Sequence, residues 1–157
     1  MTAEQIKEYT LKITRANKSE LIVVIYDMAI DYVDDALRAL ENGDKNQYRK
    51  NVKQARRCVT ELLEALNYDY EPSYPLMRIY IFVNKQLTQS MSGMKTEGVY
   101  FAKRTLEKLR ESFENIAKED TSEPLMANTE KVYAGLTYGK SSLNENISGS
   151  GNRGFCV

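Results

Sequence analysis

The sequence contains no histidine and no tryptophan among its 157 residues. The lack of histidine removes the commonest general base near neutral pH, the commonest zinc ligand and the imidazole of phosphorelay modules. It also excludes a bundle-type di-iron site, because such a site requires Glu-x-x-His pairs. These classes of enzyme and metal protein are therefore excluded.

The glycines are few and form no phosphate-binding loop. The segment GLTYGKSS places Lys140 and Ser141 after a glycine, but the full P-loop spacing and a preceding buried strand are missing. The adjacent carboxylates Asp34 and Asp35 are interpreted as charges on a solvated helix face. We therefore expect a protein that is not an enzyme, with no catalytic, cofactor-binding or metal-binding residues.

Net charge and long apolar runs are also lacking. Lys and Arg number 22, as do Asp and Glu, so no basic excess attracts a polyanion and we expect no nucleic-acid partner. No apolar run approaches the roughly 20 residues needed to cross a bilayer, and no export signal is visible. The two cysteines, Cys58 and Cys156, follow no metal or disulfide spacing, and Cys58 is interpreted as a small core residue. These features predict a cytoplasmic protein without membrane insertion.

What the sequence does contain is helical periodicity in four stretches. Asn17 and Glu20 form a capping pair that predicts a helix from about residue 18, and the turn NGD at 42–44 ends it. Asp44 is predicted to cap a second helix. Pro75 suits the first turn of a third, expected over about 75–91, and the connection SGMKT leads to a fourth.

Each stretch carries an apolar stripe with steps of three or four residues. The predicted stripes are Leu21, Ile25, Met28, Tyr32, Ala36 and Leu40; Tyr48, Val52, Ala55, Val59, Leu62 and Leu66; Leu76, Ile79, Val83 and Leu87; and Val99, Ala102, Leu106, Leu109, Phe113 and Ile116. Similar lengths and short loops predict an all-α fold, an antiparallel up-down four-helix bundle.

The two ends of the chain have a different character. Before the bundle, Tyr9, Leu11 and Ile13 alternate with polar residues, which is the period of an extended chain. After it, Gly, Ser and Asn are frequent, so little apolar surface offsets the cost of ordering. We predict an arm at 1–16, the bundle at 17–119 and a mobile tail at 120–157. Docking of the tail segment VYAGLTYG onto the bundle is left open.

Two helices carry more apolar residues than one buried stripe requires, in the runs LIVVIY and IYIFV. In an up-down bundle these surpluses lie at the same end, beside the tyrosine-rich loop NYDYEPSYP. The cluster predicts an apolar binding groove, although any one residue could instead widen the core. The groove candidates are Ile22, Tyr26, Tyr70, Tyr74, Tyr80, Ile81 and Phe82. We expect the arm to cover this groove as a lid through Tyr9, Leu11 and Ile13.

Asp27 is the polar residue that stands out within the first apolar run. It is interpreted as part of a solvated face or as a partner for an amide or hydroxyl group. A specific hydrogen bond to the arm or to a bound client is the alternative.

Several segments together resemble the flagellin-specific export chaperones of bacterial flagella, the FliS family. They are IKEY, NKSELIVVIYDMAI, ENGDKNQY, ELLEALNYD, and VYAGLTYGKSSLNE with NRGF, so the resemblance spans almost the whole chain. It implies a bundle that binds the disordered C-terminal segment of flagellin, prevents premature polymerisation and delivers flagellin to the cytosolic domain of the export gate. By resemblance, Ile6 and Tyr9 match the arm residues that contact the gate.

The sequence departs from the family pattern at three places. Lys18-Ser19 stands where Ser-Pro is frequent, Tyr70-Glu71-Pro72 where a Gly pair is frequent, and Asn84-Lys85 where an Arg pair is common. These changes put individual client contacts in doubt. The alternatives are a related bundle chaperone or adaptor for another secreted flagellar protein, such as the filament cap, and a regulatory binding module.

Overall fold

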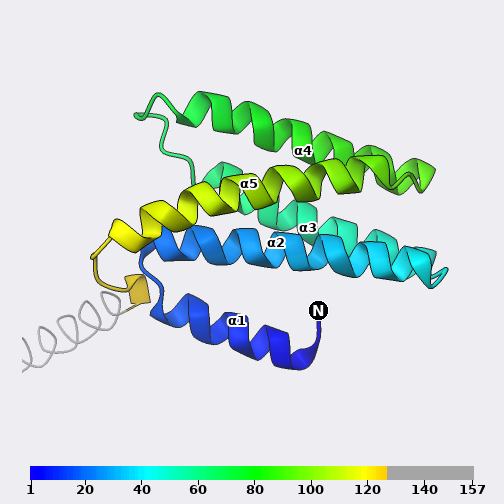
Figure 1. Ribbon diagram of the computed structural model, residues 1–157, viewed down its shortest axis with the longest axis horizontal. Coiled ribbons are helices and arrows are strands. Elements are labelled where there is room, and N and C mark those ends of the chain that lie inside the picture. Colours follow the sequence, from blue (N-terminus) through cyan, green and yellow to red (C-terminus); the bar gives the residue numbers. More distant parts are fainter. Residues whose placement is uncertain (127–157) are drawn as a thin grey trace, which may run out of the picture.

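The computed structural model describes residues 1–126, and over these residues the chain is helical without any strand. Its helices are α1 (Ala3–Arg15), α2 (Lys18–Glu41), α3 (Lys45–Glu64), α4 (Ser73–Gly93) and α5 (Glu97–Glu119). Figure 1 shows α2, α3, α4 and α5 lying side by side and running in alternating directions. The prediction of an all-helical bundle is confirmed. The predicted mobile tail beyond residue 126, including VYAGLTYG and Cys156, lies outside the described residues.

The starts of two helices follow directly from their capping residues. The Asn17 side chain accepts a hydrogen bond from the Glu20 amide, and the Glu20 carboxylate accepts one from the Asn17 amide, each 2.9 Å long. Asp44 accepts a 2.8 Å hydrogen bond from the Gln47 amide at the start of α3. Both caps satisfy backbone N–H groups that have no partner within the helix, so both predicted starts are confirmed.

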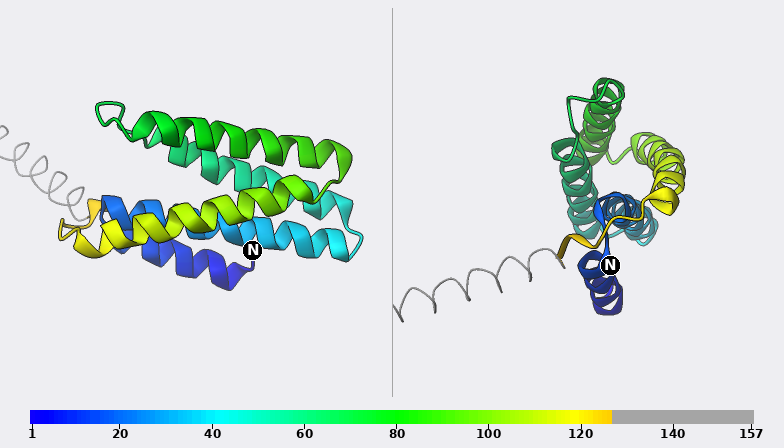
Figure 2. Two further views of the ribbon diagram at one scale, coloured as in Figure 1. Left: turned by 45° about the horizontal axis from the view of Figure 1, so that its top comes forward. Right: turned by 90° about the vertical axis from the view of Figure 1, so that its left-hand side faces the viewer.

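Helix α2 occupies the centre of the contact network. It packs against α1, α3 and α5, whereas α4 packs against α3 and α5. Seen along the helices, α3 and α5 lie on opposite sides of the bundle (Figure 2). The fully buried residues of α2 differ from the predicted stripe, with which they share only Ala36. They are Tyr26, Ala29, Val33 and Ala36. The predicted residues Ile25, Met28, Tyr32 and Leu40 are partly buried and pack against this core.

The core of the other helices follows most of the predicted stripes. Cys58 is buried beside them as expected, but the predicted Ile116 is 53% exposed and Tyr80 on α4 is buried outside the predicted stripe. Burial raises the pKa of the Cys58 thiol to about 12. The buried members of these stripes are Tyr48, Val52, Ala55, Val59 and Leu62; Val83 and Leu87; and Val99, Ala102 and Leu106.

The segment predicted as an extended arm is a helix, so that prediction is wrong. Thr2 accepts a hydrogen bond from the Gln5 amide, and the Gln5 side chain accepts one from the Thr2 amide, which completes a capping box. Glu8 and Lys12 form an ion pair across one turn, 2.7 Å apart. Tyr9 and Ile13 are four residues apart and share a helix face, whereas Leu11 points away and is 50% exposed. A period of two over so few residues did not distinguish strand from helix.

The first turn of α5 lies unusually close to α4. A Cβ atom added at Gly98 would lie 2.8 Å from the carbonyl oxygen of Gln86, which is too close for any other residue without a backbone shift. Nearby, the rings of Phe82 and Phe101 meet edge to face with centroids 5.2 Å apart. Glycine therefore permits the close packing of α4 and α5 at this end.

Candidate functional site

An apolar groove of about 450 Å³ lies where the start of α2, the end of α3, the start of α4 and the end of α5 meet. We call it the end groove. Its walls combine aliphatic side chains with aromatic rings and a few polar groups. The lining residues are Lys18, Ser19, Ile22, Leu62, Ala65, Leu66, Asn67, Tyr70, Pro72, Ser73, Leu76, Tyr80, Phe113 and Ile116. This composition is typical of a site that binds apolar groups with a small number of directing polar contacts.

A pair of buried tyrosines forms the base of the end groove. The hydroxyl groups of Tyr26 and Tyr80 share a hydrogen bond, and the Tyr26 ring lies 5.5 Å from the Phe113 ring, between centroids. Burial raises the pKa of Tyr26 and of Tyr80, so both stay protonated. The paired hydroxyls satisfy one another, which allows two polar groups to remain below an apolar groove.

The α3–α4 loop supplies exposed tyrosines at the edge of the groove. Tyr70 is 69% exposed, and Tyr68 on the loop lies beside Tyr74 in the first turn of α4, with ring centroids 5.9 Å apart. The loop is held in place by the buried Ser73, whose hydroxyl donates a 2.5 Å hydrogen bond to the Asn67 carbonyl oxygen. Exposed rings on a fixed loop offer apolar area to a partner at little cost in ordering.

The chain segment after α5 returns to the start of α2 beside the end groove. The side-chain Nδ2 of Asn17 donates to the carbonyl oxygen of Asp120 at 3.1 Å, and the Ser19 hydroxyl donates to the Asp120 carboxylate at 2.5 Å. The Leu125 amide donates to the Ala16 carbonyl oxygen at 3.0 Å. Hydrogen bonds from Ser122 and Ser19 lower the pKa of Asp120 to about 2. Residues 120–125 thus attach to the bundle.

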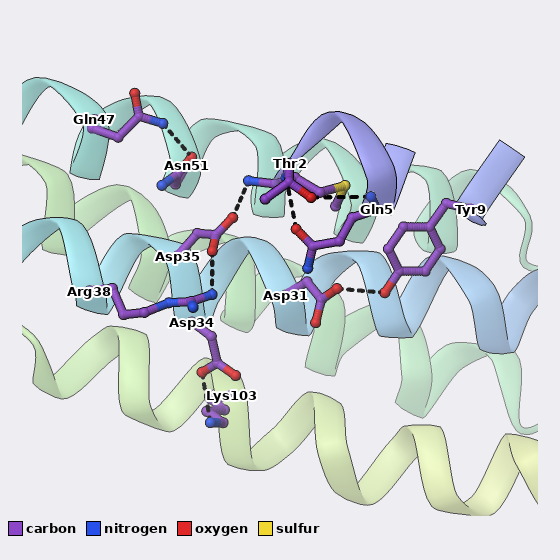
Figure 3. A network of polar contacts seen from close by, with 11 residues as sticks. Thr2, Gln5, Tyr9, Asp31, Asp34, Asp35, Arg38, Gln47, Asn51 and Lys103 are labelled. Atoms are coloured by element: carbon purple, nitrogen blue, oxygen red, sulfur yellow. Dashed lines mark hydrogen bonds and ion pairs between the residues drawn. The ribbon is translucent and has the colours of Figure 1, made fainter. Parts of the chain in front are cut away.

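Helix α1 is attached to the acidic side of α2, as Figure 3 shows. The Tyr9 hydroxyl donates a 2.7 Å hydrogen bond to Asp31, and the N-terminal ammonium group of Met1 pairs with Asp35. Tyr9 is only 8% exposed, whereas Ile6 is 52% exposed. The two residues that match the gate-contacting pattern therefore differ in access: Ile6 is open to solvent and Tyr9 is covered.

The structure brings three of the seven groove candidates together in the end groove, namely Ile22, Tyr70 and Tyr80. Tyr26 lies beneath them and is fully buried, so its expected role on an open surface is corrected. It is buried because α2 packs against three other helices, so α2 needs more apolar residues than a single buried stripe supplies.

The remaining candidates lie outside the lining of the end groove. Tyr74 is exposed beside Tyr68 on the loop. Phe82 is 46% exposed and lines a separate recess of about 510 Å³ between α4 and α5, together with Phe101. Ile81 is exposed on α4. On α4, Ile81 and Phe82 thus face solvent, whereas Tyr80 is buried like Tyr26, so its expected exposure is corrected as well.

The lid residues lie on α1, whose described residues do not line the end groove. Leu11 instead lines a recess of about 310 Å³ between α1 and α2, with Ala16 and Val24. Tyr9 is buried against α2, and Ile13 is partly buried. Helix α1 therefore packs on α2 and does not cover the end groove in this structure, in contrast to the lid that the sequence predicted.

Sequence reasoning missed the ion pairs that join α2 to α5. Asp27 pairs with Arg110, which also contacts Glu114 at 3.2 Å, and Asp34 lies 2.7 Å from Lys103. Asp27 therefore has a structural partner on another helix instead of the expected solvent, arm or client. The partners are more than 60 residues apart, so no local pattern pointed to them.

Within residues 1–126, no group of three or more potential metal-binding side chains comes together. Likewise, no helix of the described part is long and apolar enough to span a membrane. The bundle and its end groove define a helical protein with a surface suited to an apolar peptide segment.

The comparison with protein families gives this class a more specific identity. Residues 2–120 match the family described as flagellar protein FliS. The match covers most of the sequence, so the chain belongs to the FliS family of flagellar export chaperones. A comparison with curated proteins found no significant match.

Proposed function

We propose that this protein is a cytosolic chaperone for flagellin. It binds the disordered C-terminal segment of flagellin, prevents its premature polymerisation and delivers it to the flagellar type III export gate. The end groove carries the proposal, because it combines apolar walls from Ile22, Leu66 and Phe113 with the exposed ring of Tyr70. Membership of the FliS family supports the same class of function.

The energetics of a disordered client suit this surface. A segment that folds on binding loses several kcal/mol in ordering, roughly 2 to 5, and requires a long apolar track in compensation. The end groove, the loop tyrosines and the Phe82 recess together offer such a track across the bundle. Helical parts of the client would lie in grooves between helices, with apolar anchors at steps of three and four. Neither ATP nor a catalytic residue is required.

The proposal assigns a part to each region of the chain. Residues 17–119 form the antiparallel four-helix bundle that holds the client, and residues 1–16 form a detachable element. Residues 120–157 form the tail. Ile6 and Tyr9 contact the export gate, and Tyr9, Leu11 and Ile13 shield α2 until a partner displaces α1. Because Tyr9 is covered in this structure, its contact with the gate requires α1 to leave α2.

Isothermal titration with a flagellin C-terminal peptide tests the proposed function. We expect Tyr70→Ala to weaken peptide binding about tenfold, since a buried aromatic anchor contributes on the order of 1–3 kcal/mol. Tyr100→Ala is the control, because Tyr100 is an exposed tyrosine too, at 48%, but does not line the end groove. Equal losses in the two variants would contradict the assignment of the groove.

The alternative is a related chaperone or adaptor for another secreted flagellar protein, or a regulatory binding module. A peptide from the C terminus of the filament-cap protein distinguishes the first alternative from the proposal. Tight binding of the cap peptide without binding of flagellin would replace flagellin as the client. Binding of neither peptide would favour a regulatory module.

A further inference from the structure

The outer face of α3 carries a continuous set of positive charges, which we call the basic face. Five of its six members are exposed, Arg56 is partly buried at its edge, and the set extends about 18 Å along the helix at 1.5 Å per residue. The same helix contributes Glu61 and Glu64 near its end, so the positive charge is concentrated in residues 45–57. The basic face consists of Lys45, Arg49, Lys50, Lys53, Arg56 and Arg57.

The basic face differs from the acidic side of α2 in how its charges are paired. Asp27, Asp34 and Asp35 each form an ion pair within the described chain, and Asp31 accepts the Tyr9 hydrogen bond. Within residues 1–126, none of the six cations of the basic face forms an ion pair. The contrast is local: the aspartates on this side of α2 have partners within the described chain, whereas the cations clustered on α3 remain available.

The basic face also contains a recess with unused hydrogen-bonding groups. Lys50, Lys53, Arg56 and Arg57 line a hollow of about 690 Å³ with Gln54, Thr60 and Glu61. At its edge the Arg56 Nε atom and the Asn84 Oδ1 atom are buried without a partner among the described residues. Thr60 connects them, because it accepts from Asn84 at 3.3 Å and donates to the Arg56 carbonyl oxygen at 3.0 Å. Buried polar atoms usually have partners, so this edge suits an incoming polar group.

We propose that the basic face binds an acidic protein segment, a helix or strand with a row of Asp and Glu side chains. Arg49, Arg56 and Arg57 present planar guanidinium groups that pair with carboxylates in bidentate geometry. The surface is separate from the end groove, which is lined by Leu62 near the far end of α3 and by Ala65, Leu66 and Asn67 in the segment that follows the helix. The protein can therefore hold this partner and a client at the same time.

Two other anionic partners fit the basic face less well. A membrane surface is disfavoured because an interfacial helix needs large apolar residues beside its cations, and the exposed positions of the recess are all polar. A nucleic acid is disfavoured because the chain as a whole has zero formal charge and because Glu61 lines the recess. An acidic protein segment fits such a mixed surface better, because its carboxylates are separate charges that pair with individual cations.

Fluorescence anisotropy with a labelled helical peptide of about 20 residues, with Glu side chains along one face, tests the proposal. The peptide with Gln in place of Glu is the reference. We expect the Glu peptide to bind the wild-type protein and to weaken between about 50 mM and about 200 mM salt, whereas the Gln peptide does not bind. The triple variant Arg49→Glu/Lys53→Glu/Arg57→Glu is expected to lose at least about tenfold in affinity.

A second triple variant, Lys7→Glu/Arg104→Glu/Lys118→Glu, makes the same change in net charge on α1 and α5 and is expected to bind normally. Equal losses of peptide affinity in both variants would overturn the proposal, because binding would then depend only on the net charge of the protein. The milder variant Arg49→Gln/Lys53→Gln/Arg57→Gln, checked by circular dichroism, guards against a folding defect and is expected to lose binding too. Normal binding by that folded variant would overturn the proposal.

The competing partners are tested in the same assay. Tighter binding of a single-stranded RNA of similar length, or of vesicles of equal parts phosphatidylglycerol and phosphatidylcholine, would overturn the choice of a protein partner. Self-association of the wild-type chain that disappears in the first triple variant would also overturn it, because the occupant would be a second copy. Flagellin-peptide binding is expected to be unchanged in the triple variant, so failure of this inference leaves the proposed client groove standing.

Discussion

The hydroxyl group of Tyr9 on α1 donates a 2.7 Å hydrogen bond to the carboxylate of Asp31 on α2. The Tyr9 ring is almost fully covered, and burial, followed by the nearby negative charge of Asp31, raises the pKa of its hydroxyl. This bond and the Met1–Asp35 ion pair hold a short helix against the bundle through two adjacent turns of α2. Isolated helices as short as α1 are marginal in water, so its order depends on this attachment.

Replacing Tyr9 with Phe is expected to loosen α1 without unfolding the bundle. The change removes a hydrogen bond to a charged acceptor and costs α1 docking about 1.5–3 kcal/mol. Hydrogen exchange measured by mass spectrometry should show faster exchange in residues 3–15 and unchanged exchange in α3. Lys7→Ala, on an exposed position of α1, is the control. Unchanged protection of α1 in Tyr9→Phe would show that the hydrogen bond does not hold the helix.

The Tyr26–Tyr80 hydroxyl pair should behave as a coupled unit. Tyr26→Phe or Tyr80→Phe alone leaves one buried hydroxyl without a partner and is expected to lower the free energy of unfolding by about 1–3 kcal/mol. The double Phe variant should be less destabilised than the sum of the singles, because no orphan group remains. Urea denaturation of the four proteins in a double-mutant cycle measures the coupling. Simple additivity would mean that the two hydroxyls do not depend on each other.

Acid should weaken the attachment of the segment that follows α5. The folded-state pKa of Asp120 is lowered from 3.8 to about 2 by hydrogen bonds from Ser122 and Ser19. A lowered carboxyl pKa favours the folded contact above the unfolded value, and this contribution disappears as the pH falls from about 4 to about 2. An NMR titration of the Asp120 carboxyl carbon checks the pKa, and Ser19→Ala is expected to raise it. An Asp120 pKa near 4 in both proteins would rule out the hydrogen-bonded arrangement.

Gly98→Ala is expected to destabilise the packing of α5 on α4. The added Cβ atom would lie 2.8 Å from the Gln86 carbonyl oxygen, so the backbone of α4 or α5 has to move. We expect this to lower the free energy of unfolding by about 1–3 kcal/mol. Gly93→Ala is the matched control, because its nearest neighbour at 3.3 Å is the flexible side chain of Lys95. Thermal and urea unfolding of both variants compare the two sites. A more stable Gly98→Ala protein would mean that helix propensity outweighs the contact.

The bundle helices were predictable because their signals are local. Asn17, Glu20 and Asp44 act within one turn of their own helix, so sequence alone placed the starts of α2 and α3 correctly. The stripes of α3 and α5 were also predictable, since each of these helices buries one narrow face. Helix α1 was missed because Thr2 and Gln5, its capping pair, were overlooked beside a brief alternating pattern.

Only some of the residues that line the end groove could be predicted from the sequence. The sequence predicted that Ile22, Tyr70 and Tyr80 lie at the same end of the bundle, and all three line the end groove there. That this groove binds a client stays a prediction. It could not show that Tyr26 would be buried, because the number of neighbours around α2 is a property of the whole fold. It also could not show that Asp27 pairs with Arg110, since that contact joins distant segments.

The contact between Asn17 and Asp120 means that the chain enters the bundle and leaves it at the same pole. A linker of a few residues would close this gap in a protein that lacks α1 and the residues after 120, and new termini could open in the turn at residues 42–44. Such a circularly rearranged bundle would keep the contacts among α2, α3, α4 and α5 while moving both chain ends to the opposite pole. Fluorescent labels or fusion partners placed there would leave the end groove unobstructed.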